Sequence, residues 1–304
     1  MKLGEPKFSR DFELGELRLL RILVCLLFLG RAWQGIFWDL PLRTFFWDQS
    51  LLEGVVTTLT GDTWQHYVTN ESINIDKIIN VLGCSLGFFW AFCAIFVLLV
   101  KKEWKFGKWL MYAGSLSFFL LALLYFKDKF WQVGQFFEYA TQVTAPLIFV
   151  HVLYGGKNTF YFRRGVKLII AITFFCHGLY ACAYYPQPGI WIQWCMDVFG
   201  FRDDLTARQF LIWIGWIDFA VAILLFVPIK TFSWVAIWYC IIWGTMTSFA
   251  RIVGNFYVTM IFESLHQHVY ETLYRLVHGG IPLFLWYCYR RKGANTDPSL
   301  KNEV

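Results

Sequence analysis

Ionisable side chains interrupt the apolar runs that make up most of this sequence, and they are concentrated in its second half. The segment ESLHQHVYETLYRLVHGGIPLFLWY carries Glu271, Arg275 and His278, spaced four and three residues apart. That spacing places all three on one helical face, and a glutamate four residues before an arginine favours an intrahelical ion pair. An ionisable group at the centre of a membrane helix costs about 2.5–3.5 kcal/mol, so each needs a partner or a task. We expect these side chains to face the protein interior.

Two more polar residues lie in nearby apolar runs. His177 stands in CHGLYACAYYPQPGIW, and Asp218 stands in GWIDFAVAILLFVP. Together with Glu271, Arg275 and His278, they are expected to converge on an interior cavity open to the outer side, where they could bind a ligand. The alternatives are a salt-bridge network that only joins helices, and a path for protons or ions. The two prolines that follow His177 predict the turn that ends its helix.

Arg31 is the corresponding candidate in the first half. It lies near Trp33 and Trp38, and it could hold the anionic or carbonyl head of a ligand. Alternatively, its side chain extends to the lipid headgroups, while Gly30 and Gly35 serve close helix packing.

No metal site is expected. His266 and His268 stand near Glu263, but this spacing at the junction of a loop and a helix is common by chance. The sequence has no CxxC motif, which argues against a redox dithiol or a thiolate zinc site. Seven of the eight cysteines lie in apolar runs, where cysteine acts as a small hydrophobic residue: Cys25, Cys84, Cys93, Cys176, Cys182, Cys240 and Cys288.

The composition predicts an all-α membrane protein. Of 304 residues, 58% are hydrophobic and 16% are charged, against roughly 45–50% and about 25% in soluble domains. Apolar runs of about 20 residues are long enough to cross a hydrocarbon core roughly 30 Å thick. We expect a transmembrane bundle of eight helices, at 18–38, 78–100, 108–126, 136–154, 167–185, 209–228, 231–250 and 269–289.

Lysine and arginine predict the orientation, because these residues are retained on the cytoplasmic side. With the N-terminus inside, the cytoplasmic segments hold 17 of the 27 basic residues, and an even number of spans places both termini in the cytoplasm. The net charge of +6 then faces anionic membrane lipid, not nucleic acid. The outer loops 39–77 and 186–208 are rich in Trp and Phe, which predicts short interfacial helices that cover the outer mouth of the bundle, or that only anchor it at the interface. The tail 293–304 is expected to be disordered.

An internal repeat is also predicted. Residues 29–41 resemble 176–188, and the GFFWAFCAIFVLL run at 87–99 resembles the GWIDFAVAILLFVP run. The fourth spans end similarly, as PLIFVHVLYGGK and PLFLWYCYRRK. We therefore expect two parallel four-helix repeats, 1–157 and 158–292. The sequence shows no signal for broken helices at corresponding places in the two halves.

The second repeat resembles the DoxX-like family of four-helix membrane proteins. The resemblance rests on the HGLYA segment at 177–181, on GWIDFAVAILLFVP and on WGTMTSFARI, and it covers residues 167–289 best. It implies membrane redox chemistry, including quinone-linked sulfur oxidation. No catalytic set transfers, because no defined active-site motif can be matched.

Three functions remain open for a protein expected in a bacterial inner membrane. The first is the binding of a quinone or a similar lipophile in an outward-facing aromatic pocket. His177 or His278 would donate to the carbonyl oxygens, and the protein would supply binding without a redox centre of its own. The second is a non-enzymatic subunit that docks partner membrane proteins of an envelope complex. The third is a transporter of small lipophiles or ions, which the repeat favours and the lack of broken-helix signals disfavours.

Overall fold

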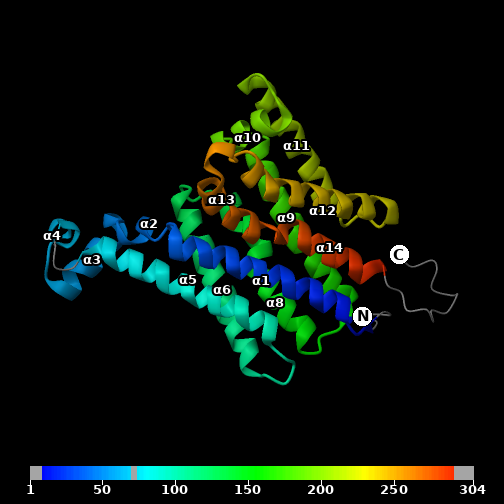
Figure 1. Ribbon diagram of the computed structural model, residues 1–304, viewed down its shortest axis with the longest axis horizontal. Helices are drawn as coiled ribbons and strands as arrows, with labels where there is room; N and C mark the ends of the chain where they lie inside the picture. The colour runs from blue at the N-terminus through cyan, green and yellow to red at the C-terminus, as the bar shows by residue number, and fades with distance from the viewer. Residues whose placement is uncertain (1–8, 70–73, 291–304) are drawn as a thin grey trace, which may run out of the picture.

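The computed structural model describes residues 9–69 and 74–290, and these form a bundle of helices (Figure 1). Two residues at each of two places form a small antiparallel sheet, β1 (Ser9–Arg10) with β2 (Asn158–Thr159). The predicted tail 293–304 lies outside the described residues. Within them, seven helical segments are long and apolar enough to cross a membrane, as expected for an integral membrane protein: α1 (Leu14–Phe37), α5 (Ile75–Leu99), α6 (Phe106–Asp128), α7 with α8 (Val133–Leu153), α9 (Phe160–Ala181), α11 (Asp204–Leu224) and α12 (Lys230–Val253).

The predicted span 269–289 is two helices, α13 (Ile261–Arg275) and α14 (Val277–Arg290). Pro282 lies inside α14, and because proline has no N–H it cannot donate to the carbonyl of His278 four residues earlier. The fourth segment of the first half is broken in the same way, into α7 (Val133–Glu138) and α8 (Ala140–Leu153), with Pro146 inside α8. Both halves therefore contain a broken fourth segment, although the sequence shows no signal for it.

Short polar side chains start several of the helices. The Thr159 hydroxyl accepts a hydrogen bond from the Phe162 N–H at the start of α9, and the Asp203 carboxylate accepts one from the Thr206 N–H at the start of α11. These caps satisfy backbone donors that have no partner within the helix. The positions of these caps determine where each helix begins, and hence where the side chains further along the helix lie relative to the membrane surface.

Glycines allow two helix pairs to pack closely. Gly35 on α1 lies against Gly87 on α5, where a Cβ added at Gly87 would lie 2.8 Å from the Ile36 nitrogen. Likewise, α9 packs on α11 at Gly178 and Gly215. Small residues let the backbones of membrane helices approach one another, which increases their van der Waals contact. In each half, the first two helices therefore pack closely through a pair of glycines.

The two halves also exchange contacts. Helix α1 of the first half packs against α13 of the second, while α9 of the second half packs against α7 of the first. Helices α8 and α14 contact each other between them. The C-terminal end of α13 and the helices α8 and α14 are therefore buried, and each broken segment packs against the first helix of the opposite half.

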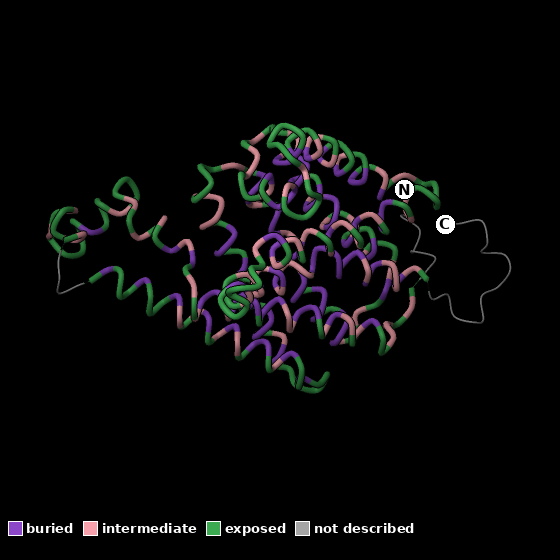
Figure 2. Tube along the Cα trace, turned by 45° about the horizontal axis from the view of Figure 1, so that its top comes forward, coloured by how far each residue is buried: buried purple, intermediate pink, exposed green. Residues whose placement is uncertain are grey.

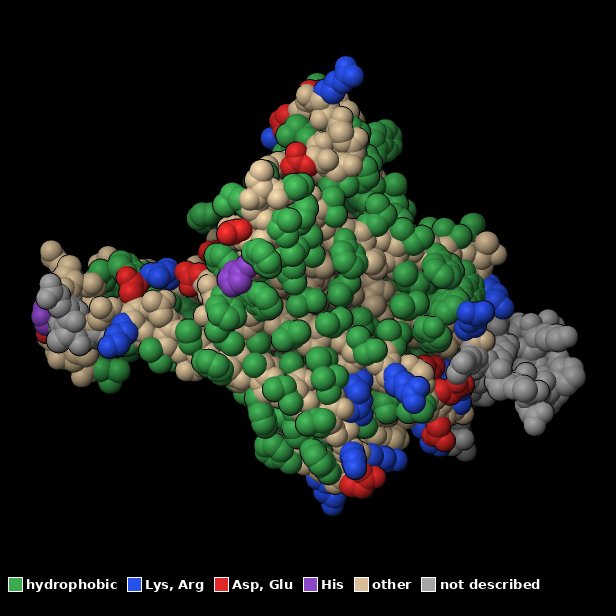
Figure 3. Space-filling model, viewed as in Figure 1, with side chains coloured by type: hydrophobic (Ala, Val, Ile, Leu, Met, Phe, Trp, Pro, Cys, Tyr) green, Lys and Arg blue, Asp and Glu red, His purple; other side chains and the backbone are tan. Residues whose placement is uncertain are grey.

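The surface of the bundle is largely apolar. On the face shown in Figure 3, hydrophobic side chains cover the middle of the molecule, whereas Lys and Arg gather near the end that carries both termini. Large side chains such as Phe88, Leu116 and Trp216 are more than half exposed. An apolar surface of this extent is expected where the surrounding solvent is hydrocarbon.

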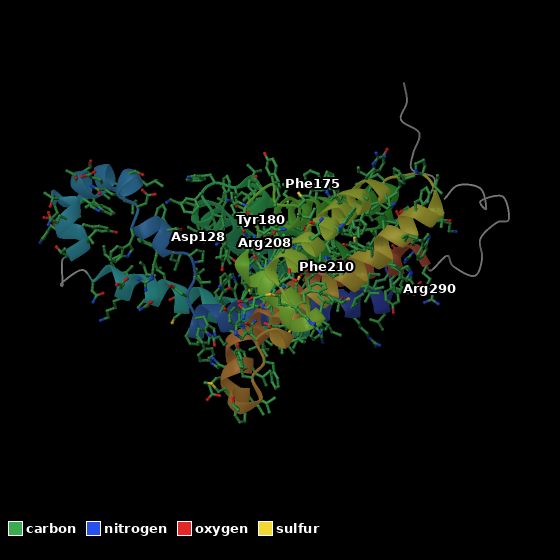
Figure 4. The ribbon with its side chains drawn as sticks, turned by 90° about the horizontal axis from the view of Figure 1, so that it is seen from above. Asp128, Phe175, Tyr180, Arg208, Phe210 and Arg290 are labelled. Carbon is green, nitrogen blue, oxygen red and sulfur yellow. The ribbon has the colours of Figure 1, made fainter. Side chains whose placement is uncertain are left out.

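The predicted short helices of the outer loops are present: α2 (Arg43–Phe46), α3 (Gln49–Thr60), α4 (Trp64–Thr69) and α10 (Gly189–Phe199). Helices α3 and α4 pack chiefly on each other and stand apart from the bundle, where they are mostly exposed (Figure 2). Figure 4 shows this arm at the end of the molecule opposite Arg290. Helix α10 packs on α11 and α12, and α2 of the first loop packs on α5 and α6. The expected cover over the bundle therefore does not extend to α3 and α4.

Candidate functional site

A buried carboxylate joins the ends of two helices to a third helix in the interior of the bundle. Glu138, the last residue of α7, has its Oε1 2.8 Å from Nη1 of Arg275 at the end of α13, and 3.1 Å from Nε2 of His177 on α9. Glu138 is 4% exposed. The two helix breaks bring an acid from one half and a base from the other to the same place. Pairing of this kind is what allows charges to remain in a low-dielectric interior.

A second ion pair lies between α12 and α13. Nε of Arg251 is 3.4 Å from Oε2 of Glu271, although without hydrogen-bond geometry, and the Thr272 hydroxyl donates to the Ser248 carbonyl over 2.8 Å. The Arg251 guanidinium also lies 4.9 Å from the ring centroid of Trp194 on α10. Helix α10 is thereby connected to the buried charges of the bundle.

The predicted pair of Glu271 with Arg275 does not form. Arg275 turns to Glu138, and Glu271 turns to Arg251 on the neighbouring helix. Partners on other helices draw each side chain away from its neighbour four residues along. The interior orientation predicted for Arg275 agrees with the structure, but its partner is in the other half of the chain.

His278 lies beside His177, with 5.3 Å between their ring centroids. It is 1% exposed, and its Nε2 has no hydrogen-bond partner within the described part of the chain. A buried polar nitrogen without a partner is uncommon in folded proteins and marks a place of interest. His278, at the start of α14, therefore places an imidazole nitrogen without a hydrogen-bond partner next to His177, which itself pairs with Glu138.

Asp218 is buried in α11 and is 1% exposed. Its carboxyl group accepts a hydrogen bond from the Tyr239 hydroxyl over 2.8 Å, and no basic side chain forms an ion pair with it in residues 9–69 and 74–290. It faces the same space as His177 and Arg275.

That space is a cavity of about 270 Å³ among α9, α10, α11, α12 and the end of α13, which we call the C-terminal cavity. Its volume is near the lower end of the roughly 300–1,000 Å³ typical of ligand pockets. Its polar lining residues include His177, Asp218, Arg251 and Arg275. The remaining wall is mostly apolar and aromatic, with Trp191, Trp194, Val198, Phe199, Leu211, Ile214, Trp243, Met246, Phe249 and Val253 among its residues.

The structure thus brings together most of the predicted ligand-binding residues. His177, Asp218 and Arg275 line the C-terminal cavity, while His278 and Glu271 contact residues that line it. Arg31 is not among them. It is fully buried in the first half, where the Gln34 and Gln142 side chains accept its hydrogen bonds.

Aromatic rings complete the surroundings of Arg31. The Tyr274 ring centroid lies 3.7 Å from its guanidinium carbon, and Tyr139 is 5.2 Å away. No carboxylate pairs with Arg31 within the described ranges, so tyrosine π faces and amide oxygens hold this cation. Trp33 and Trp38, which were expected beside it, pack instead against His266.

Glu138, Arg251 and the tryptophans of α10 complete the site. Glu138 and Arg251 are recognisable in the sequence as ionisable residues within apolar runs, but they were not expected among the five residues that converge on the cavity, because nothing local indicates their partners. Among the described residues, no group of three or more His, Cys, Asp or Glu side chains is placed to hold a metal ion. The donors and the aromatic wall suit an organic ligand with a polar head.

No protein-family model, no curated protein and no solved structure matches the chain.

Proposed function

We propose that this integral membrane protein binds a lipophilic molecule in the C-terminal cavity, with the polar head of the ligand at the buried charged residues. The observation that carries the proposal is the composition of the cavity wall. Three tryptophans, Trp191, Trp194 and Trp243, line the cavity together with Arg251 and Arg275. Pockets for small amphiphiles combine a hydrophobic wall with a few convergent polar groups in this way.

Access from the membrane supports a lipophile over a water-soluble ligand. The cavity wall includes Met246 and Phe249 on α12, and these side chains are 45% and 47% exposed on the surface of the bundle. That surface is apolar and suits contact with hydrocarbon. A molecule dissolved in the bilayer could therefore reach the cavity past α12.

A quinone is one member of the proposed ligand class. Its flat ring suits contact with indole rings, and its carbonyl oxygens accept hydrogen bonds from guanidinium or imidazole groups. The protein would bind and orient the quinone, while the redox chemistry would belong to the quinone itself. The resemblance of residues 167–289 to the DoxX-like family favours the same class.

The test is direct identification of a bound lipophile. Protein purified in detergent is extracted with organic solvent, and the extract is analysed by absorbance and mass spectrometry. We expect a stoichiometric lipophile in the wild type, which is lost when Trp243→Arg fills the apolar wall with a charge. Trp109→Arg, at a 71% exposed position on α6, serves as the control for altered detergent binding. An extract without any stoichiometric lipophile, and no saturable binding of added decylubiquinone, would contradict the proposal.

We further propose eight membrane crossings, with both termini in the cytoplasm of a bacterial cell, and two repeats at 1–157 and 158–292. The exchanged contacts support a two-fold relation, since α1 packs on α13 as α9 packs on α7. The matching breaks at Tyr139 and Leu276, each followed by a proline inside the next helix, support it as well. Labelling of single introduced cysteines by an impermeant maleimide tests the topology. A cysteine at Gly61 should react from outside intact cells, and one in the tail 293–304 should not.

Transport of a small lipophile or ion is the second candidate, and the broken helices favour it. Discontinuous helices that meet in the interior form the binding sites of many transporters. Here the ends of α7 and α13 meet at the ion pair of Glu138 with Arg275. Flux into proteoliposomes that is abolished by His177→Ala, but retained by a surface variant, would support transport over simple binding.

A further inference from the structure

Three buried N–H groups on side chains that line the C-terminal cavity lack a hydrogen-bond acceptor. They are Nε of Arg251, Nε of Arg275 and the indole Nε1 of Trp194, and none finds a partner among the described residues. Arg251 is 4% exposed and Trp194 is 9% exposed, so bulk solvent does not readily satisfy them. A buried donor without an acceptor costs about 1–3 kcal/mol, and more when it belongs to a charged group.

The three donors come from three different helices. Trp194 is on α10, Arg251 is near the end of α12, and Arg275 is at the end of α13. The Arg251 guanidinium lies 4.9 Å from the Trp194 ring centroid, so these two residues are direct neighbours. A small group with several acceptor atoms at this end of the cavity could satisfy more than one donor.

The unpaired N–H groups of the two arginines, and not the net charge around the cavity, favour an anionic ligand. Two guanidinium groups, of Arg251 and Arg275, line the cavity, whereas Asp218 is the single acidic residue of the lining and accepts the Tyr239 hydroxyl. Glu138 accepts a hydrogen bond from Nη1 of Arg275, and Glu271 lies near Nε of Arg251 without hydrogen-bond geometry. The Nε–H groups of both arginines are therefore left without an acceptor. An oxyanion offers several acceptor oxygens and forms charge-assisted hydrogen bonds, which are roughly twice as strong as neutral ones.

We propose that the ligand of the C-terminal cavity is an acidic amphiphile, in which a carboxylate or phosphate binds at Arg251, Trp194 and Arg275 and an apolar chain lies along the tryptophan-lined wall. This inference rests on the proposed function, which it narrows from lipophiles in general to those with an anionic head. The same chemistry is supplied by a free fatty acid and by a single-chain anionic phospholipid.

Competition binding separates these possibilities. The purified full-length protein in dodecyl maltoside, a detergent without phosphate, is titrated with tritiated oleate. Unlabelled oleate, oleoyl lysophosphatidic acid, oleyl alcohol and decylubiquinone then compete. We expect oleate or lysophosphatidic acid to bind at least about tenfold more tightly than oleyl alcohol, which has the same chain as oleate without the charge. The stronger of the two acids identifies the source of the anion.

Two variants locate the anion. The double variant Arg251→Gln/Glu271→Gln removes both charges of one pair, so that no buried charge is left alone, and it should weaken oleate binding roughly tenfold to a hundredfold. Trp194→Phe keeps an aromatic wall, removes only the N–H donor and should weaken binding a few-fold. Arg43→Gln, a half-exposed arginine of the first half, is the control and should change nothing.

The results that overturn the inference are distinct from those that overturn the proposed function. If oleyl alcohol or decylubiquinone competes as well as oleate, and the double variant does not alter their order, the ligand is a neutral lipophile and the inference fails alone. If none of the four compounds binds saturably, the inference and the proposed function both fail.

Discussion

Replacement of Glu138 by glutamine tests the buried charge cluster most sharply. The change keeps the size of the side chain but leaves Arg275, whose side chain is 14% exposed, without an anion at 2.8 Å, and His177 without one at 3.1 Å. Removal of one partner of a buried ion pair typically costs about 3–5 kcal/mol. Because the glutamine oxygen can still accept one hydrogen bond, we expect a loss near the lower value, about 3 kcal/mol.

The loss is measurable as a melting temperature of the purified protein followed by tryptophan fluorescence. At about 2.1 cal/mol/K per residue, the unfolding entropy of 304 residues is about 640 cal/mol/K, so a loss of about 3 kcal/mol lowers the midpoint by roughly 5 °C. The matched control is Asp204→Asn, which breaks the exposed pair with Arg208. Exposed pairs contribute only about 0–1 kcal/mol, so this control should melt within a few degrees of the wild type.

A double variant separates the ion pair from other effects of the substitution. Glu138→Gln/Arg275→Gln removes both charges, so it should be less destabilised than the sum of the two single variants by about 1–3 kcal/mol. A Glu138→Gln protein that melts with the wild type would refute the argument that these charges stabilise one another. Strict additivity in the double variant would refute it as well.

Three further outcomes are expected. Arg275→Lys, which keeps a cation, should express and melt closer to the wild type than Arg275→Ala, and equal behaviour of the two would argue against a buried pair. Gly87→Leu should lower the melting temperature by displacing α5 from α1. Gly54→Leu is the control and should not lower it, because no atom lies within 4 Å of a Cβ added at Gly54. Equal melting temperatures of the two variants would count against close packing of α1 and α5. The hydrogen bond from Lys127 lowers the pKa of the partly exposed Asp48 carboxyl to about 2, below its ordinary 3.8. The contact should therefore hold α3 at every pH above about 4 and be lost as the pH falls toward 2, which amide hydrogen exchange in α3 can follow. Asp48→Asn should remove this pH dependence. If the variant keeps the pH profile of the wild type, the assignment to Asp48 is contradicted.

Much of the fold follows from hydropathy alone. Runs of about 20 apolar residues predict helices at nearly the observed places, because the spacing of such runs depends on bilayer thickness and little else. The short helices of the outer loops were also predicted, from their Trp and Phe content. The break between α13 and α14 was not predicted from the sequence, because a single proline such as Pro282 is tolerated in many continuous membrane helices.

The sequence predicted which residues belong to the site better than it predicted which of them pair with one another. His177, Asp218 and Arg275 were expected to share an interior space because isolated charges in a membrane need partners, and the structure places them on one cavity. The pair of Glu138 with Arg275 joins residues 137 positions apart. Such a contact depends on how the two halves pack, and no local spacing encodes it. The same reason explains why Arg31 was expected near a ligand and lies instead among tyrosine rings.

A density map of the protein purified from its native membrane tests the central claim most directly. We expect elongated density in the C-terminal cavity, with the head of the ligand within hydrogen-bond distance of Arg251 and its chain along Trp191 and Trp243. A map that resolves these side chains and shows the cavity empty, or closed by the wall residues themselves, would contradict it.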